Sequence, residues 1–162
     1  MNSEAAIRAA LAKGLDGVEM DVQLTADSVL VAHHDMALSG PVCVGRIADH
    51  DWQTLEGCAL PGVQGGFQGV RPDRLLNRLA KEYPKAEFTL DVKLDTEDDW
   101  WTYLHRFTRA IARLEREAGL EGRLIVECRT IDLLRAMAED APAIPCYLIV
   151  DRPERAVSTA LG

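Results

Sequence analysis

The sequence predicts an α/β fold in which parallel strands are joined by helices. Segments with helical periodicity alternate with short apolar segments, in the order helix, strand with hairpin, helix, strand, helix, strand, helix, strand, helix. Such alternation is typical of parallel strands with right-handed crossover connections. Two strands also carry charged residues on one face and apolar residues on the other. Because helices cover the outside of a parallel sheet, the charged faces should look into a barrel or across a cleft.

Composition indicates one domain with a real core. The chain has 162 residues, 48% of them hydrophobic, and a net charge of −8. No apolar run approaches the ~18 residues of a membrane span, and no secretory signal is seen at the start. The negative net charge disfavours nonspecific binding to nucleic acid, because such binding requires clustered Lys and Arg. The cysteines are widely spaced and predict reduced thiols in a cytoplasmic protein: Cys43, Cys58, Cys128 and Cys146.

The first elements are expected to be a helix and a β-hairpin. Asn2 or Ser3 can cap the helix, and Gly14 can end it. A strand then begins at Gly17, and after a turn at residues 26–28 the chain returns through a second strand over residues 29–32.

The charged face of this hairpin is where the sequence predicts chemistry. Glu19 and Asp21 are two residues apart and therefore point to the same side of a strand. In a closed interior two carboxylates are tolerable only beside a cation. The return strand leads into His33, His34 and Asp35, which can bring an imidazole alongside. The alternatives are a solvated acidic face and a histidine that hydrogen-bonds within a turn.

The middle of the chain is predicted to hold connecting segments and one helix. Residues 36–45 are expected to form a loop, residues 49–57 a short turn or helix, and the glycine-rich residues 61–69 a surface loop. Pro72 favours the first turn of a helix that ends near residues 83–84.

A second informative strand is predicted over residues 87–94, with Asp91 and Lys93 on its polar face. A long helix over residues 96–118 follows, with inward side chains that include Trp101, Leu104, Ile111 and Leu114. The remaining predictions are a strand at residues 123–127, a helix at 131–139, a strand at 146–150 and a helix at 153–161. Barrel active sites form at the carboxyl ends of parallel strands, and the charged residues of both strands should converge there.

Several of these segments resemble those of a known protein family. The segments GVEMDVQLT at residues 17–25, VAHHD at residues 31–35 and TLDVK at residues 89–93 closely resemble the glycerophosphodiester phosphodiesterase family. Residues 2–7 also look like the first helix of that family. The resemblance implies a TIM barrel of the phospholipase-C-like type. Here we expect a single partial domain over residues 1–162, an incomplete barrel with about four or five parallel strands plus a hairpin.

The resemblance also implies a metal-dependent hydrolase of lipid and glycerol metabolism. It would cleave glycerophosphodiesters to glycerol 3-phosphate and an alcohol. The family's metal ligands fall on Glu19, Asp21 and Asp91, oxygen ligands that suit Mg²⁺ or Ca²⁺. A catalytic histidine of the family falls on His34, as general acid or base. Lys93 matches a residue expected to contact phosphate, the alternative being a salt bridge with Asp91 or Glu19.

The chain departs from the family pattern at several points. No strand ending in His-Arg-Gly precedes Asn2, Asp91 stands where the family usually has Glu, and Cys128-Arg129 stands where Ser-Phe is common. A complete barrel takes about 250 residues. Open barrel edges favour a homo-oligomer that covers them. The alternative functions are a degenerate barrel that binds a divalent cation or a phosphorylated ligand without turnover, and an assembly module.

Overall fold

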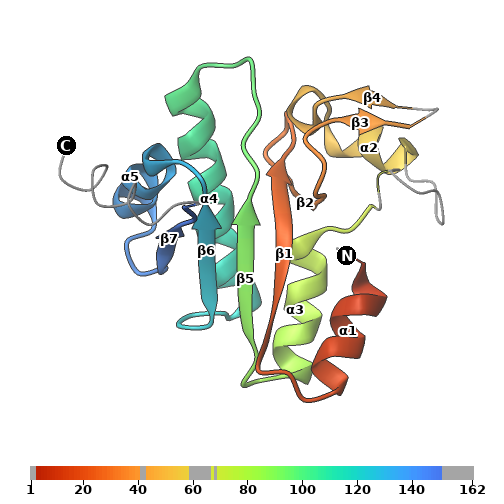
Figure 1. Ribbon diagram of the computed structural model, residues 1–162, viewed down its shortest axis with the longest axis vertical. Helices are drawn as coiled ribbons and strands as arrows, with labels where there is room; N and C mark the ends of the chain where they lie inside the picture. The colour runs from red at the N-terminus through yellow and green to blue at the C-terminus, as the bar shows by residue number, and fades with distance from the viewer. Residues whose placement is uncertain (1–2, 41–42, 59–66, 68, 151–162) are drawn as a thin grey trace.

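The computed structural model describes residues 3–40, 43–58, 67 and 69–150. In this part of the chain the main sheet has five strands in the order β2-β1-β5-β6-β7. Their bounds are Leu30–Ala32, Gly17–Leu24, Glu87–Val92, Leu124–Cys128 and Cys146–Leu148, in that order. The edge strand β2 is antiparallel to β1, and the other neighbours are parallel. Figure 1 shows β1, β5 and β6 with their carboxyl ends at the same edge. The predicted alternation is confirmed, and the sheet is an open, incomplete barrel.

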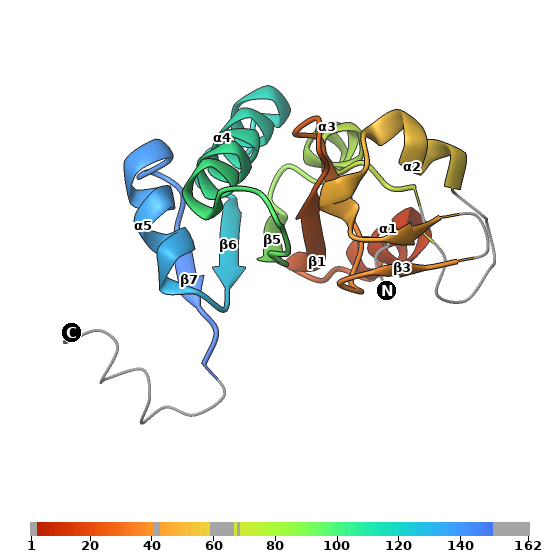
Figure 2. The same ribbon diagram turned by 90° about the horizontal axis from the view of Figure 1, so that it is seen from above.

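Three helices lie along one face of this sheet, as Figure 2 shows: α3 (Pro72–Glu82), α4 (Trp100–Ala118) and α5 (Ile131–Asp140). They lie in the crossover connections between the parallel strands: α3 between β1 and β5, α4 between β5 and β6, and α5 between β6 and β7. A shorter helix, α1 (Glu4–Ala12), precedes β1. The described helices are too short or too polar to cross a membrane.

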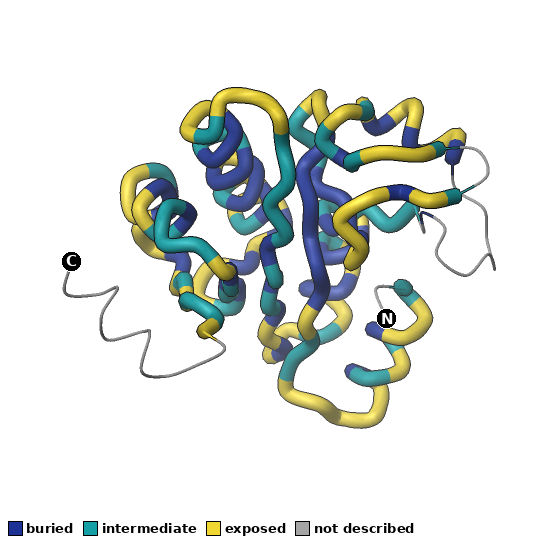
Figure 3. Tube along the Cα trace, turned by 45° about the horizontal axis from the view of Figure 1, so that its top comes forward, coloured by how far each residue is buried: buried dark blue, intermediate teal, exposed yellow. Residues whose placement is uncertain are grey.

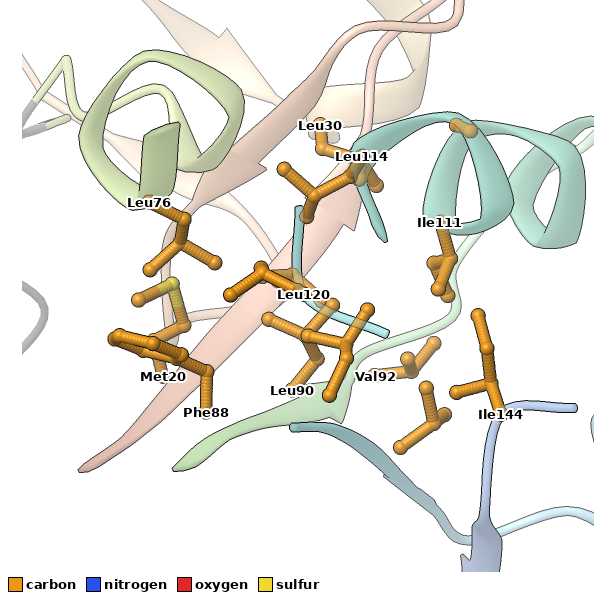
Figure 4. Close-up of a cluster of buried hydrophobic side chains, with 14 of the residues drawn as sticks. Met20, Leu30, Leu76, Phe88, Leu90, Val92, Ile111, Leu114, Leu120 and Ile144 are labelled. Carbon is orange, nitrogen blue, oxygen red and sulfur yellow. The ribbon is translucent and has the colours of Figure 1, made fainter. Parts of the chain in front are cut away.

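The core lies between the helices and the strand residues that alternate with the polar ones. Met20 on β1 and Phe88 and Leu90 on β5 are fully buried, and Figure 4 shows them packed near Leu76 of α3. Figure 3 shows buried residues along most of β1 and on the sheet-facing sides of the helices. This packing directs the alternate, polar residues of the same strands away from the helices, as the two-residue period requires.

Local signals at the amino end act as predicted. Ser3 caps α1 by accepting a hydrogen bond from the Ala6 amide at 3.3 Å. Gly14 then adopts a φ of +84°, which favours glycine. Gly17 starts β1 so close to β5 that a Cβ atom would lie 2.8 Å from the Glu87 carbonyl oxygen. Glycine at this position therefore allows β1 to begin beside β5.

A smaller apolar cluster packs beside the sheet around Trp52, Leu55 and Phe67. Its buried residues come from the strand β3 (Leu38–Ser39), the 3₁₀ helix η1 (Ile47–Asp49) and the helix α2 (Trp52–Cys58), among others, whereas the strand β4 (Val44–Gly45) is exposed. The loop prediction for residues 36–45 was therefore wrong in part, because β3 and β4 pair as an antiparallel ribbon. The short helix expected near residues 49–57 is confirmed.

The expectation of four reduced cysteines was wrong for two of them. Cys43 and Cys58 form a disulfide with a Cα–Cα distance of 5.7 Å, within the ~4.4–6.8 Å typical of such bonds. Their separation of 15 residues along the chain gave no sign of this, because α2 folds back onto the β3–β4 ribbon only in the tertiary structure. Cys128 and Cys146 are free thiols, as predicted.

The long helix begins later than its periodicity suggested. Asp99 caps α4 by accepting a hydrogen bond from the Thr102 amide at 2.8 Å, so residues 96–99 precede the helix. Trp101 was predicted to face inward, but it is 44% exposed, whereas Tyr103 is buried. The predictions for residues 153–161 and for most of residues 61–69 fall outside the described residues.

Candidate metal centre

Three carboxylates meet on the polar face of β1 and β5, beside the carboxyl end of β5. Glu19 and Asp21 come from β1 and Asp91 from β5, where Asp21 and Asp91 are direct register partners. One carboxylate oxygen from each residue lies within 4.8 Å of the others. Asp21 is 5% exposed, Asp91 is half-buried and Glu19 is exposed to solvent. The structure thus brings together the three residues that the sequence singled out as metal ligands.

A lysine of the same strand end lies between two of these carboxylates. The Lys93 Nζ atom is 3.0 Å from Asp21 Oδ1 and 2.5 Å from Asp91 Oδ2. The Lys93 amide donates to the Val22 carbonyl at 2.9 Å, which continues the pairing of β5 with β1 one residue beyond the strand. The salt bridge weighed as an alternative for Lys93 is therefore present, with Asp21 as a partner in addition to Asp91.

The site concentrates negative charge in a partly dry place. Loss of water around Glu19, followed by repulsion from Asp21 and Asp91, raises the pKa of the Glu19 carboxyl. Burial opposes the charge of Lys93, but its hydrogen bonds to Asp91 and Asp21 prevail and raise the pKa of its ammonium group. A positive charge at this point is what the carboxylates require.

The donor set fits a divalent metal ion. All three candidate ligands are carboxylates, the oxygen donors that Mg²⁺ and Ca²⁺ prefer. The Oδ1 atom of Asp91 is buried and has no hydrogen-bond partner in the described structure. A buried acceptor without a donor is costly, and a bound cation would satisfy it.

The two histidines after β2 differ sharply in their surroundings. His34 is exposed, and its Nδ1 atom lies 2.9 Å from Asp35 Oδ1. This contact lowers the pKa of the Asp35 carboxyl. His33 is 5% exposed and stacks at a tilt against Phe67. Burial lowers the pKa of the His33 imidazole, which favours its neutral form. Of the two, His34 has a side chain that a ligand can reach.

Two residues near this site were missed in the sequence. Gln23 lies on the same face of β1 as Glu19 and Asp21, and it is 2% exposed. Glu127 on β6 is the register partner of Asp91, so its side chain shares the inner face of the sheet. The signal was available in each case, because the two-residue period continues from Asp21 to Gln23 and applies equally to β6.

The hairpin that carries the site is held from outside by α4. Arg106 donates to the Thr25 carbonyl at 3.2 Å and to the Ala26 carbonyl at 2.5 Å. It also donates to Ser28 Oγ at 3.0 Å. Ser28 has a φ of +62°, which marks the tight turn between β1 and β2. These bonds tie the turn of the hairpin to the helix layer.

An open TIM-type sheet with a carboxylate cluster on its polar face, beside the carboxyl end of β5, defines an α/β-barrel protein with a candidate cation site. The family model for the glycerophosphoryl diester phosphodiesterase family matches residues 1–160. The chain therefore belongs to the glycerophosphoryl diester phosphodiesterase family. No curated protein sequence matches it significantly.

Solved structures share the fold. A protein of Silicibacter pomeroyi superposes with a TM-score of 0.79 and 19% identity over 99% of this chain and 68% of its own. A glycerophosphodiester phosphodiesterase of Parabacteroides distasonis gives 0.72 and 22% over 90% and 57%. An Oleispira antarctica phosphodiesterase, solved with its product sn-glycerol-3-phosphate, gives 0.72 and 17% over 98% and 65%. The chain thus spans 57–68% of the length of these three proteins.

Proposed function

We propose that this chain carries the metal and acid–base half of a site that hydrolyses glycerophosphodiesters to glycerol 3-phosphate and an alcohol. The proposal rests mainly on the observation that the carboxylates of Glu19, Asp21 and Asp91 meet on the polar face of β1 and β5. Family membership over residues 1–160 supports it, as does the Oleispira antarctica relative with its bound product. We propose that residues 1–162 form a single partial domain of this type.

In this proposal the carboxylates of Glu19, Asp21 and Asp91 hold Mg²⁺ or Ca²⁺. When bound, the cation supplies a positive charge that stabilises the negative charge developing on the phosphoryl oxygens. Lys93, whose ammonium group now pairs with Asp21 and Asp91, would turn to the phosphate as a second positive group.

His34 is the proposed general acid–base residue. Its ring is accessible, and its Nδ1 atom bonds to Asp35, so its Nε2 atom is the one directed to a substrate. The imidazole would take a proton from the attacking hydroxyl or return one to the departing alcohol oxygen. Asp35 keeps the ring in one orientation.

The decisive experiment compares the purified chain with its Glu19→Ala variant. We expect metal-dependent release of glycerol 3-phosphate from glycerophosphocholine, loss of this activity on addition of a chelator, and no detectable activity in the variant. Circular dichroism should be unchanged, because Glu19 is exposed and takes no part in the core. The matched control is Glu56→Ala, which removes an exposed carboxylate from α2.

Equal activity in Glu19→Ala and the parent chain would refute the proposal. Cation binding by the parent chain without turnover would instead favour the degenerate barrel that binds a metal or phosphorylated ligand. Isothermal titration with Mg²⁺ and with Ca²⁺ separates these outcomes and identifies the preferred ion.

We also propose that the chain self-associates through its open sheet. On the side of β1 away from β5, ladder pairing in the described structure covers only residues 22–24, by β2. At the opposite edge Tyr147 of β7 is 57% exposed. Unpaired strand edges and exposed apolar surface favour association. Light scattering should report a dimer or larger species, and a monomer at high micromolar concentration would contradict this.

A cytoplasmic location stays a proposal from the sequence. The disulfide between Cys43 and Cys58 weighs against it, because such bonds form and persist mainly in oxidising compartments. Mass spectrometry of the protein purified from its native cells would detect whether this bond is formed there.

A further inference from the structure

We infer that Gln23 is a positioning residue, which holds the backbone around His34 against the strand that carries Glu19 and Asp21. The Nε2 atom of Gln23 donates to the carbonyl oxygen of His33 at 3.0 Å and to that of Asp35 at 2.8 Å. The two bonds bracket His34 on both sides. One amide group therefore links the metal-ligand strand directly to the acid–base segment.

The chemistry of the amide suits this role. A primary amide nitrogen has two N–H groups, and Gln23 uses both on the carbonyls beside His34. Carbonyl oxygens only accept hydrogen bonds, so the nitrogen of Gln23 must face them. Gln23 is 2% exposed and its bond to the His33 carbonyl is buried. Loss of the amide would remove the donor that this carbonyl has among the described residues, and an unpaired buried carbonyl is costly.

Within the described part of the chain, the backbone on either side of His34 is held to β1 by one hydrogen bond besides those of Gln23. Strand pairing between β1 and β2 ends at Ala32, and the last backbone bond to β1 runs from the His33 amide to the Asp21 carbonyl at 3.2 Å. The His34 side chain is 63% exposed, and in the described residues its hydrogen bond is to the neighbouring Asp35. The position of the imidazole therefore depends on the backbone that Gln23 holds.

Gln23 also shares its strand face with the metal ligands. It lies two residues beyond Asp21 and four beyond Glu19, so the three side chains project from one rigid element. A strand that fixes both ligand positions and the segment around His34 sets their relative geometry. A small misplacement of a reacting group can cost about 10²-fold in rate. The catalytic part of this inference rests on the proposed function, whereas its structural part does not.

The test uses Gln23→Leu, which keeps the approximate size and removes both donors. The backbone amides of His34 and Asp35 should become more mobile, with NMR order parameters falling from about 0.85 towards 0.6 or below. The amides of Asp21 and Asp91 should keep their values. In activity assays kcat should fall by about 10-fold or more, while KM and the affinity for Mg²⁺ stay unchanged. This split separates a positioning role from a general loss of structure.

Gln53→Leu makes the same chemical change at an exposed position of α2 and should alter none of these values. If Gln23→Leu does not fold, Gln23→Asn keeps the donors but shortens the side chain by one methylene group, and the same mobility at His34 and Asp35 is expected. Unchanged order parameters at these two residues, or changes spread evenly over the sheet, would overturn the inference. Should the parent chain show no turnover, the proposed function fails, and the NMR comparison still decides the role of Gln23.

Discussion

The variant His34→Ala is expected to lower kcat for glycerophosphocholine by about 10²- to 10⁴-fold, the usual contribution of a general acid–base group. The ring is exposed and bonds to Asp35, so its removal leaves no buried group without a partner. Affinity for Mg²⁺ should stay unchanged, because the three carboxylates lie on β1 and β5. Steady-state kinetics at saturating metal, together with calorimetric titration of Mg²⁺, would measure both quantities.

A second histidine variant serves as the control. His105 lies on α4 and bonds to Asp140 of α5 at 2.7 Å, in the helix layer and not on the inner face of the sheet. His105→Gln should leave kcat of the folded protein unchanged. An unaltered kcat in His34→Ala would remove His34 from the chemistry and leave the carboxylate cluster as a binding site alone.

The variant Lys93→Met is expected to bind Mg²⁺ more tightly and to process substrate more slowly. In the present structure the ammonium group pairs with Asp21 and Asp91, and so competes with a divalent ion for the same oxygens. Two unit charges ~4 Å apart interact by about 4 kcal/mol near a protein surface. Even if solvent relaxation offsets most of this interaction energy, we expect the affinity for Mg²⁺ to increase by about 10-fold or more.

The fall in turnover has a separate cause, because Lys93→Met removes the second positive group proposed to contact the phosphate. Titration of glycerol 3-phosphate in the presence of Mg²⁺ should therefore show weaker binding. Lys81→Met, at an exposed position on α3, controls for the change in net charge. Unchanged or weaker Mg²⁺ binding in Lys93→Met would show that Lys93 does not compete with the cation.

Much of the fold could be predicted because strand faces repeat every two residues. Phe88, Leu90 and Val92 were expected on one face of β5, and all three are buried. The same two-residue period placed Glu19 and Asp21 together on the polar face of β1. The register between β1 and β5 brings Asp91 beside them. Here local periodicity and tertiary packing agree, because the helices must cover the apolar face.

The predictions for the start of α4 failed because a local side-chain hydrogen bond, and not the periodicity of apolar residues, decides where the helix begins. The pattern of α4 extended back to residue 96, but the side chain of Asp99 bonds to the Thr102 amide and starts the helix there. Trp101, in the first turn of α4, is exposed, whereas Tyr103 packs against Phe107. A hydrogen bond of a capping side chain outweighs a weak periodic signal at a helix end.

The sequence by itself determined the order of the elements, the apolar faces and the candidate ligands Glu19, Asp21 and Asp91. The alternation of helical and strand patterns gives the order, the two-residue period within each strand gives the faces, and the resemblance to the family gives the ligands. Only the tertiary structure decided the disulfide between Cys43 and Cys58, the pairing of Lys93 and the two bonds of Gln23. Each of these contacts depends on how segments that are separate in the sequence approach one another. That approach is set by packing between elements, which no local pattern contains.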